Sequence, residues 1–230
     1  MEKVRAQIYD VPRDTPGEII VGLNDRRPEL HDVYRLDIHT GERKLIRKND
    51  DNVAGWVTDL KGNLRLGLRI TDTGGTEFLE INGETLKPIY GVSAEESASP
   101  YRFTPDGGKF YLITNKGAST DRMQLELFDL KTGKTSLVDR DPENAVDLTD
   151  ALFSEVTDEL LATVYISDLK RVYPKQKKFA NDWAALRAAL PKGELGITSL
   201  TADENVWLVS ASGDVDPGSV YVFDRRTGKA

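Results

Sequence analysis

A ten-residue stretch near the N-terminus, DVYRLDIHTG at residues 32–41, decides the fold because it recurs along the chain. Similar strings are LELFDLKTG at 125–133 and SVYVFDRRTG at 219–228, with a weaker copy, FLEING, at 78–83. In the three fuller copies an apolar run ends where Asp and Thr side chains can hydrogen-bond to turn backbone and Gly can take a positive φ. Each copy is therefore predicted to be a β-strand followed by a hairpin turn.

A second marker, an Asp in a turn-like setting ahead of a short β-rich run, shares this period. It occurs at intervals of 45, 47, 52 and 45 residues, at Asp14, Asp59, Asp106, Asp158 and Asp203. Where both markers are present, the separation from this Asp to the closing Gly is 27, 24, 27 and 25 residues. Two markers in step every 45 or so residues, with room for four strands, are typical of β-propeller blades.

The predicted fold is all-β, a β-propeller of about five four-stranded antiparallel blades with one short helical insertion. As a single domain or segment, the chain divides into blades at about residues 5–50, 51–95, 96–145, 146–194 and 195–230. No helical stretch separates successive strands, which excludes a parallel α/β fold. The sequence stops just after the Gly turn of the fifth unit, so we expect an incomplete last blade that belongs to a larger propeller.

The fourth unit departs from the repeat. Phe179, Trp183, Leu186 and Leu190 follow one another at intervals of 4, 3 and 4 and precede Pro191. That spacing puts four apolar side chains on one face of a helix, predicted over residues 178–190 and packed on the outside of the blade. A docking surface for a partner is the alternative interpretation of the stripe.

Composition excludes several classes of function. The 230 residues contain 31 basic and 38 acidic side chains, a net charge of −7, and no Cys. Thiolate zinc sites, disulfide scaffolds and a cysteine nucleophile are therefore excluded, and the scattered basic residues do not indicate nucleic-acid binding. No apolar run reaches the roughly 18 residues of a membrane span. We expect a soluble protein, whether cytoplasmic, periplasmic or secreted, with no cofactor.

Catalytic motifs are not found in the sequence. There is no G-x-S-x-G string and no P-loop, and TGGT at 73–76 is predicted to be a hairpin turn. The only histidines, His31 and His39, are eight residues apart, a spacing that matches no common metal motif. No catalytic or metal-binding residue is therefore predicted.

Three sets of charged residues could have a binding role, which the sequence supports only weakly. Glu95 and Glu96 are candidates for gripping a cationic group, against a plain solvated pair. Asp214 and Asp216 could offer oxygens to Ca²⁺, although the loop lacks the regular ligand spacing and a turn held by side chain to backbone bonds is expected. The lysines at 175–178 are expected to form a solvated helix entry.

One long string carries a family resemblance. VWLVSASGDVDPGSVYVFDRRTGK at 206–229 resembles the last propeller section of the prolyl oligopeptidase family of serine peptidases, nearest its acylaminoacyl-peptidase-like branch. Support comes from NDR at 24–26 with HDVYR at 31–35 and TGER at 40–43, and from 179–190, which looks like the family's helical insertion. Gly213 departs from the pattern, where a second Ser is common.

The resemblance implies a propeller that caps a C-terminal α/β-hydrolase domain. That domain would follow residue 230 and carry the catalytic Ser, Asp and His, while the cap admits short peptides and excludes folded proteins. Propeller Glu residues grip the peptide N-terminus in some relatives, but nothing places Glu95 and Glu96 at that position. Two alternatives stay open: a stand-alone, TolB-like propeller that binds a protein partner, and a propeller enzyme such as a glycosidase or lactonase.

Overall fold

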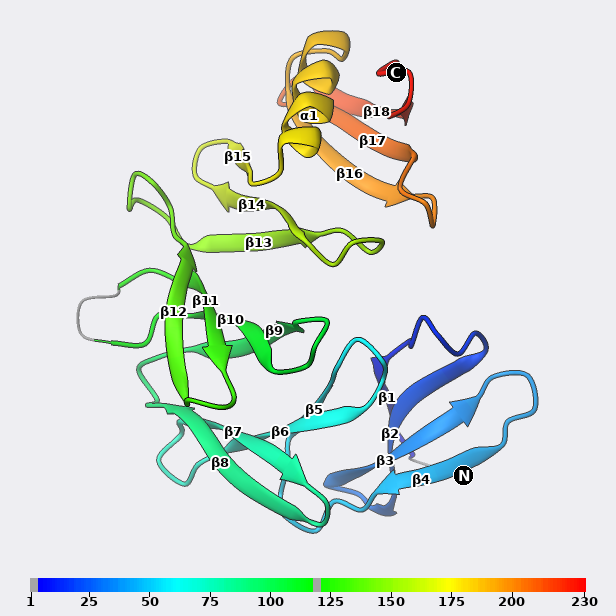
Figure 1. Ribbon diagram of the computed structural model, residues 1–230, viewed down its shortest axis with the longest axis vertical. Coiled ribbons are helices and arrows are strands. Elements are labelled where there is room, and N and C mark those ends of the chain that lie inside the picture. The colour runs from blue at the N-terminus through cyan, green and yellow to red at the C-terminus, as the bar shows by residue number, and fades with distance from the viewer. Residues whose placement is uncertain (1–3, 118–120) are drawn as a thin grey trace. The chain divides into compact units, whose positions relative to one another are not determined.

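The computed structural model describes residues 4–117 and 121–230, in which five antiparallel sheets follow one another along the chain (Figure 1). Every sheet is built from consecutive strands, each paired with its neighbour in sequence. The first three sheets have four strands apiece: β1 (Ala6–Asp10), β2 (Glu18–Arg27), β3 (Leu30–Asp37) and β4 (Arg43–Arg47); β5 (Gly55–Thr58), β6 (Leu64–Ile70), β7 (Thr76–Asn82) and β8 (Thr85–Val92); β9 (Ala98–Phe103), β10 (Lys109–Thr114), β11 (Gln124–Asp129) and β12 (Lys134–Asp139).

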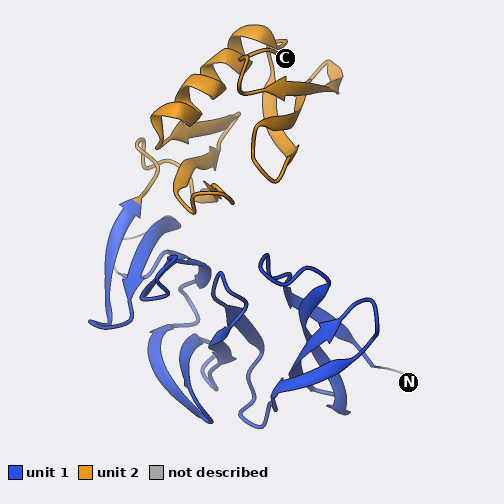
Figure 2. Cartoon of the chain, turned by 45° about the vertical axis from the view of Figure 1, so that its right-hand side comes forward, with its two compact units in different colours: residues 1–138 blue, residues 139–230 orange. Residues whose placement is uncertain are grey.

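Three further strands form the fourth sheet, and three form the fifth, with one helix between the two. The elements are β13 (Leu148–Phe153), β14 (Leu160–Ile166), β15 (Lys170–Pro174), α1 (Lys177–Ala189), β16 (Glu194–Leu200), β17 (Val206–Gly213) and β18 (Asp216–Asp224). The chain divides into two compact units, residues 1–138 and 139–230 (Figure 2). Among the described residues, no helix has the length and apolar content needed to cross a membrane.

Both sequence markers lie at the turns for which they were predicted. The five Asp residues all lie between the first and second strands of their sheets, and Gly41, Gly83 and Gly133 lie between the third and fourth. Asp37 shows the local chemistry, since its Oδ1 accepts the amides of His39 and Thr40, each at 2.8 Å. These turns form from residues within the turn itself, which is why the sequence predicts them.

In the first unit, successive sheets pack through alternating side chains of the same strand. On β7, Phe78 packs with Leu66 and Phe110 in a cluster shared by the second and third sheets. The next residue, Leu79, packs with Ile20 in a cluster shared by the first and second sheets. Consecutive side chains of a strand point to opposite faces, so one strand serves two cores and the sheets stack in series.

The fourth sheet corrects one prediction. It has three strands, not four, because the chain leaves β15 at Pro174 and enters α1 where a fourth strand was expected. Pro lacks the amide donor that a continuing strand needs. The next amide, Lys175 N, donates to Leu161 O at 2.7 Å as the chain turns away.

The helix spans 177–189, close to the predicted 178–190, and its apolar stripe is core. Phe179 and Leu186 are buried in a cluster with Trp207 and Phe223 of the fifth sheet. Trp183 is half-buried at the edge of this cluster, with its ring 6.1 Å from that of Phe179. The stripe is thus occupied by this chain's own side chains, which leaves the docking interpretation without an open apolar face.

The fifth sheet is incomplete, as predicted. β18 is its last strand, and beyond the Gly228 turn a single bridge joins Asp224 to Lys229. Asp224 Oδ1 accepts the Arg226 amide at 2.9 Å, the same local bond that closes the Asp37 turn.

Candidate functional site

The two histidines occupy separate structural roles. His31 is half-buried on β3, and its carbonyl oxygen accepts the indole N–H of Trp56 at 3.4 Å. His39 is exposed in the β3–β4 turn, with its imidazole against Gly17. In the parts of the chain that the structure describes, no group of three or more His, Asp or Glu side chains could hold a metal ion.

Glu95 and Glu96 lie between β8 and β9 and have different surroundings. Glu96 accepts the amide of Gly117 at 2.9 Å and the amide and hydroxyl of Ser93, each at 3.1 Å. These donors, Gly117 first, lower the pKa of Glu96 and keep it ionised. Glu95 is exposed to solvent. The carboxylate of Glu96 therefore closes its own loop, and a cation-gripping role for the pair stays a prediction.

The other charged candidates are found in turns and at the helix entry. Asp214 and Asp216 lie at the β17–β18 turn, where Asp216 Oδ1 accepts the Gly218 amide at 2.9 Å. Lys175 pairs with Asp139, Nζ to Oδ1 at 2.7 Å, just before α1 begins. Lys177 and Lys178 are exposed in the first turn of that helix.

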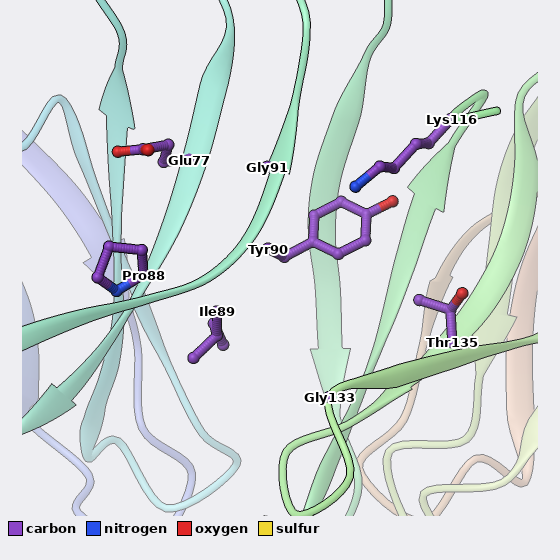
Figure 3. Close-up of a pocket in the computed structure, with 8 residues that line it drawn as sticks. All are labelled: Glu77, Pro88, Ile89, Tyr90, Gly91, Lys116, Gly133 and Thr135. Atoms are coloured by element: carbon purple, nitrogen blue, oxygen red, sulfur yellow. The ribbon is translucent and has the colours of Figure 1, made fainter.

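A cleft that the sequence does not predict opens beside β8 in the first unit (Figure 3). Its volume is about 480 Å³, and it runs from β8 to the β11–β12 turn. The lining residues are Glu77, Pro88, Ile89, Tyr90, Gly91, Lys116, Gly133 and Thr135. Strand β8 is the last strand of the second sheet, so this cleft lies between the edges of two successive sheets.

An aromatic and a cationic side chain dominate the cleft. Figure 3 shows Lys116 extending toward the Tyr90 ring, and its Nζ lies 4.4 Å from the ring centroid. The Tyr90 hydroxyl is 3.4 Å from Thr114 Oγ1. Burial raises the pKa of Tyr90, so the phenol is neutral at physiological pH. A cation within about 6 Å of an aromatic ring centroid is attracted to the face of the ring.

The lining of the cleft includes one carboxylate, that of Glu77. The carboxylate of Glu77 is neutralised by Arg69, Oε2 to Nη2 at 2.8 Å. Tyr90 lies on β8 and Lys116 lies two residues after the end of β10, and no short motif joins them. Only the packing of the second sheet on the third brings these two side chains together.

The chain is similar to two curated peptidases over nearly its whole length. No family model matches. The chain is 31% identical to dipeptidyl aminopeptidase BIII of Pseudoxanthomonas mexicana over 232 residues, which cover 98% of this chain and 32% of the relative. It is 23% identical to dipeptidyl peptidase family member 6 of Caenorhabditis elegans, over 92% of this chain and 30% of that protein. The chain therefore spans about a third of the curated relatives that it matches.

Solved structures agree on the architecture. The chain superposes on a prolyl endopeptidase with a TM-score of 0.52 at 13% identity, over 98% of this chain and 41% of that one. A puromycin-hydrolysing peptidase of Mycobacterium tuberculosis gives 0.54 at 13%, over 99% and 37%. At these identities the structures show the β-propeller fold alone; the likeness to the prolyl oligopeptidase family rests on the 31% identity to dipeptidyl aminopeptidase BIII.

For this propeller segment, the family resemblance seen in the 206–229 string is confirmed, whereas the branch is not. Both curated relatives are named as dipeptidyl peptidases, and membership of the acylaminoacyl-peptidase-like branch stays a prediction. TolB of Acinetobacter baumannii superposes with a TM-score of 0.53 at 14% identity, over 97% of this chain and 53% of TolB. At that identity the likeness shows a shared propeller fold alone.

Proposed function

We propose that this propeller segment is the non-catalytic cap of a serine peptidase that cleaves short peptides, and that it controls which substrates reach a separate α/β-hydrolase domain. The observation that carries the proposal is the 31% identity to a dipeptidyl aminopeptidase across 98% of this chain but only 32% of that enzyme. The partner of the cap is the hydrolase domain, and its substrates are short peptides.

Rigidity supports the gating part of the proposal. A gate can select by size only if its walls resist being pushed apart, and successive sheets of the first unit interlock through buried aromatic rings. The rings of Phe78 and Phe110 lie 6.2 Å apart across the second and third sheets, and both side chains are fully buried. Enclosure of this kind keeps water and folded proteins from an active site without supplying an acid, a base or a nucleophile.

The first test concerns catalysis. The isolated chain should not hydrolyse dipeptidyl amide or ester substrates, and the reading frame beyond residue 230 should encode a G-x-S-x-G elbow followed by Asp and His. Turnover by the isolated chain that a serine-directed reagent blocks would contradict the proposal, and so would a stop codon shortly after residue 230.

The second test concerns gating in the full-length protein. Phe78→Ala removes a ring between two sheets, and we expect kcat/KM for a ten-residue peptide to rise relative to that for a dipeptidyl substrate. Leu137→Ala is the matched control, because this side chain is 51% exposed on β12 and supports no sheet interface. An unchanged ratio of the two kcat/KM values in Phe78→Ala would remove the gating role and leave the cap assignment in place.

A stand-alone binding propeller is the second candidate, and the polar cleft at Tyr90 and Lys116 favours it. This candidate predicts that a protein partner is retained by the chain in the absence of peptidase activity. Lys116→Ala should weaken that retention, while Lys61→Ala, in the exposed β5–β6 turn, should not.

A further inference from the structure

The second unit contains a small pocket that is unrelated to the cleft at Tyr90. It lies between the fourth sheet on one side and β16 with α1 on the other, and its volume is about 230 Å³. Most of its wall is apolar, formed by Leu152, Val164, Ile166, Val172, Trp183, Leu195 and Ile197. The charged side chains in the lining are Asp150 and Lys170. Sites for drug-sized ligands occupy roughly 300–1,000 Å³. This pocket therefore has the size for one large apolar side chain.

A single ammonium group faces this apolar wall. Lys170, the first residue of β15, is half-buried and lines the pocket. Its Nζ lies 3.8 Å from the point where a Cβ on Gly196 would be, and Gly196 is part of the same lining. Because glycine has no side chain at this point, the ammonium can lie directly beside the pocket.

Lys170 has no counterion among residues 4–117 and 121–230. No carboxylate of these residues lies within 4.0 Å of its Nζ. Two acids lie in the neighbouring strands: Asp150, which also lines the pocket, has Oδ1 on the Ala151 amide at 2.8 Å, and Glu194 Oε1 accepts the Lys170 amide at 3.1 Å. A half-buried charge without a partner gains more from an incoming opposite charge than a fully hydrated one does.

We propose that this pocket binds an apolar carboxylate, with the hydrocarbon group against Trp183 and Ile197 and the carboxylate on Lys170. Two sources share this chemistry: the C-terminal residue of a peptide ending in leucine or a similar side chain, and a free branched-chain carboxylic acid. The inference does not depend on the peptidase assignment, because it uses only residues of the second unit.

Calorimetric titration of the full chain with N-acetyl-L-leucine tests the carboxylate requirement. N-acetyl-L-leucinamide is the matched probe, since it keeps the side chain and loses the charge. We expect the acid to bind at least about tenfold more tightly than the amide, the ratio typical of one charge-assisted hydrogen bond. Binding should also change the fluorescence of Trp183, and Trp183→Phe should remove that change.

Position 166 offers a sharper variant than removal of the lysine. Ile166 pairs directly with Lys170 across β14 and β15 and is 47% exposed, so a polar residue is tolerated there. Ile166→Glu places a carboxylate opposite the ammonium and should abolish binding of N-acetyl-L-leucine. Ile166→Gln loses the same apolar contact with the pocket but adds no charge, so it should bind the acid at least about tenfold more tightly than Ile166→Glu does. Lys170→Met should weaken the acid at least about tenfold and leave the amide unchanged.

The probes also separate the two sources. A hexapeptide ending in leucine and 4-methylpentanoate should both bind if a peptide C-terminus is the ligand, whereas binding of 4-methylpentanoate alone would assign the pocket to free acids. The proposal is overturned if no carboxylate probe binds, if acid and amide bind equally, or if Ile166→Glu and Ile166→Gln behave alike.

Discussion

Arg225 lies at the centre of a buried ionic cluster that should dominate the stability of the second unit. Its Nε donates to Asp182 Oδ2 on α1 at 2.7 Å, and its Nη1 donates to the Glu204 carbonyl at 2.9 Å. The Glu204 carboxylate lies 3.7 Å from the same Nη1 and accepts the Ser154 hydroxyl at 3.0 Å. The side chains of Arg225, Asp182 and Glu204 are only 6%, 10% and 7% exposed.

Arg225→Met should therefore destabilise this unit strongly. Methionine keeps the packing against Trp207, whose ring centroid lies 4.5 Å from the guanidinium. It leaves two buried carboxylates without their cation, and removing one partner of a buried ion pair costs about 3–5 kcal/mol. With a urea m-value of about 2 kcal/mol/M, the unfolding midpoint should fall by about 1.5–2.5 M.

Fluorine NMR of 5-fluorotryptophan-labelled protein in urea measures this, because Trp183 and Trp207 report on the second unit and Trp56 on the first. Arg226→Met is the matched control: the adjacent arginine is 64% exposed and pairs with Asp224 on the surface, where ion pairs contribute little. Equal midpoints for the two variants would refute the reasoning. Replacing Asp182 by Leu together with Arg225→Met should restore part of the loss, since no unpaired charge then remains at that contact.

Three further predictions follow from the same contacts. Acid should destabilise the fold, because donors on Thr201 and Asn205 lower the pKa of Asp203 from 3.8 to about 2. The contribution of Asp203 to the free energy of unfolding is therefore complete above pH 4 and is lost as the pH falls toward 2. The urea midpoint of Asp203→Asn should depend less on pH in that range. Gly133→Ala should cost about 1–2 kcal/mol, because φ is +67° there, whereas Gly213→Ala, with open space around its Cβ and no positive φ, should not shift the thermal midpoint. Leu186→Ala should cost about 2–5 kcal/mol by leaving a cavity under α1, measured by the same NMR titration; a loss under 1 kcal/mol would show that the helix does not belong to the core.

Much of the fold could be predicted from the sequence because its turns are local. Asp37 bonds to amides two and three residues away, so a short string contains the whole interaction. The helix could be predicted as well, because its four apolar residues recur with the period of a helix. The replacement of a fourth strand by α1 could not be predicted. A strand pairs with a partner outside its own segment, so a local pattern does not show how many strands a sheet contains.

The candidate sites show the opposite behaviour. Glu95 and Glu96 stood out as a charged pair, yet Glu96 is engaged by Gly117, 21 residues away. Tyr90 with Lys116, and Lys170 with Trp183, are unremarkable in the sequence. They form sites because sheets or a helix pack side by side, and packing joins residues that have no fixed separation along the chain.

The turn at residues 224–228 shows both what the sequence determines locally and what the tertiary structure decides. Its five residues determine the hairpin by themselves, since Asp224 bonds the Arg226 amide and Gly228 supplies the positive φ. Nothing in the string tells Arg225 from Arg226. Tertiary structure decides that one arginine is buried and the other exposed. The acid that pairs with Arg225 is on a helix 43 residues away, and a charged side chain is buried only where a partner in space pairs with it.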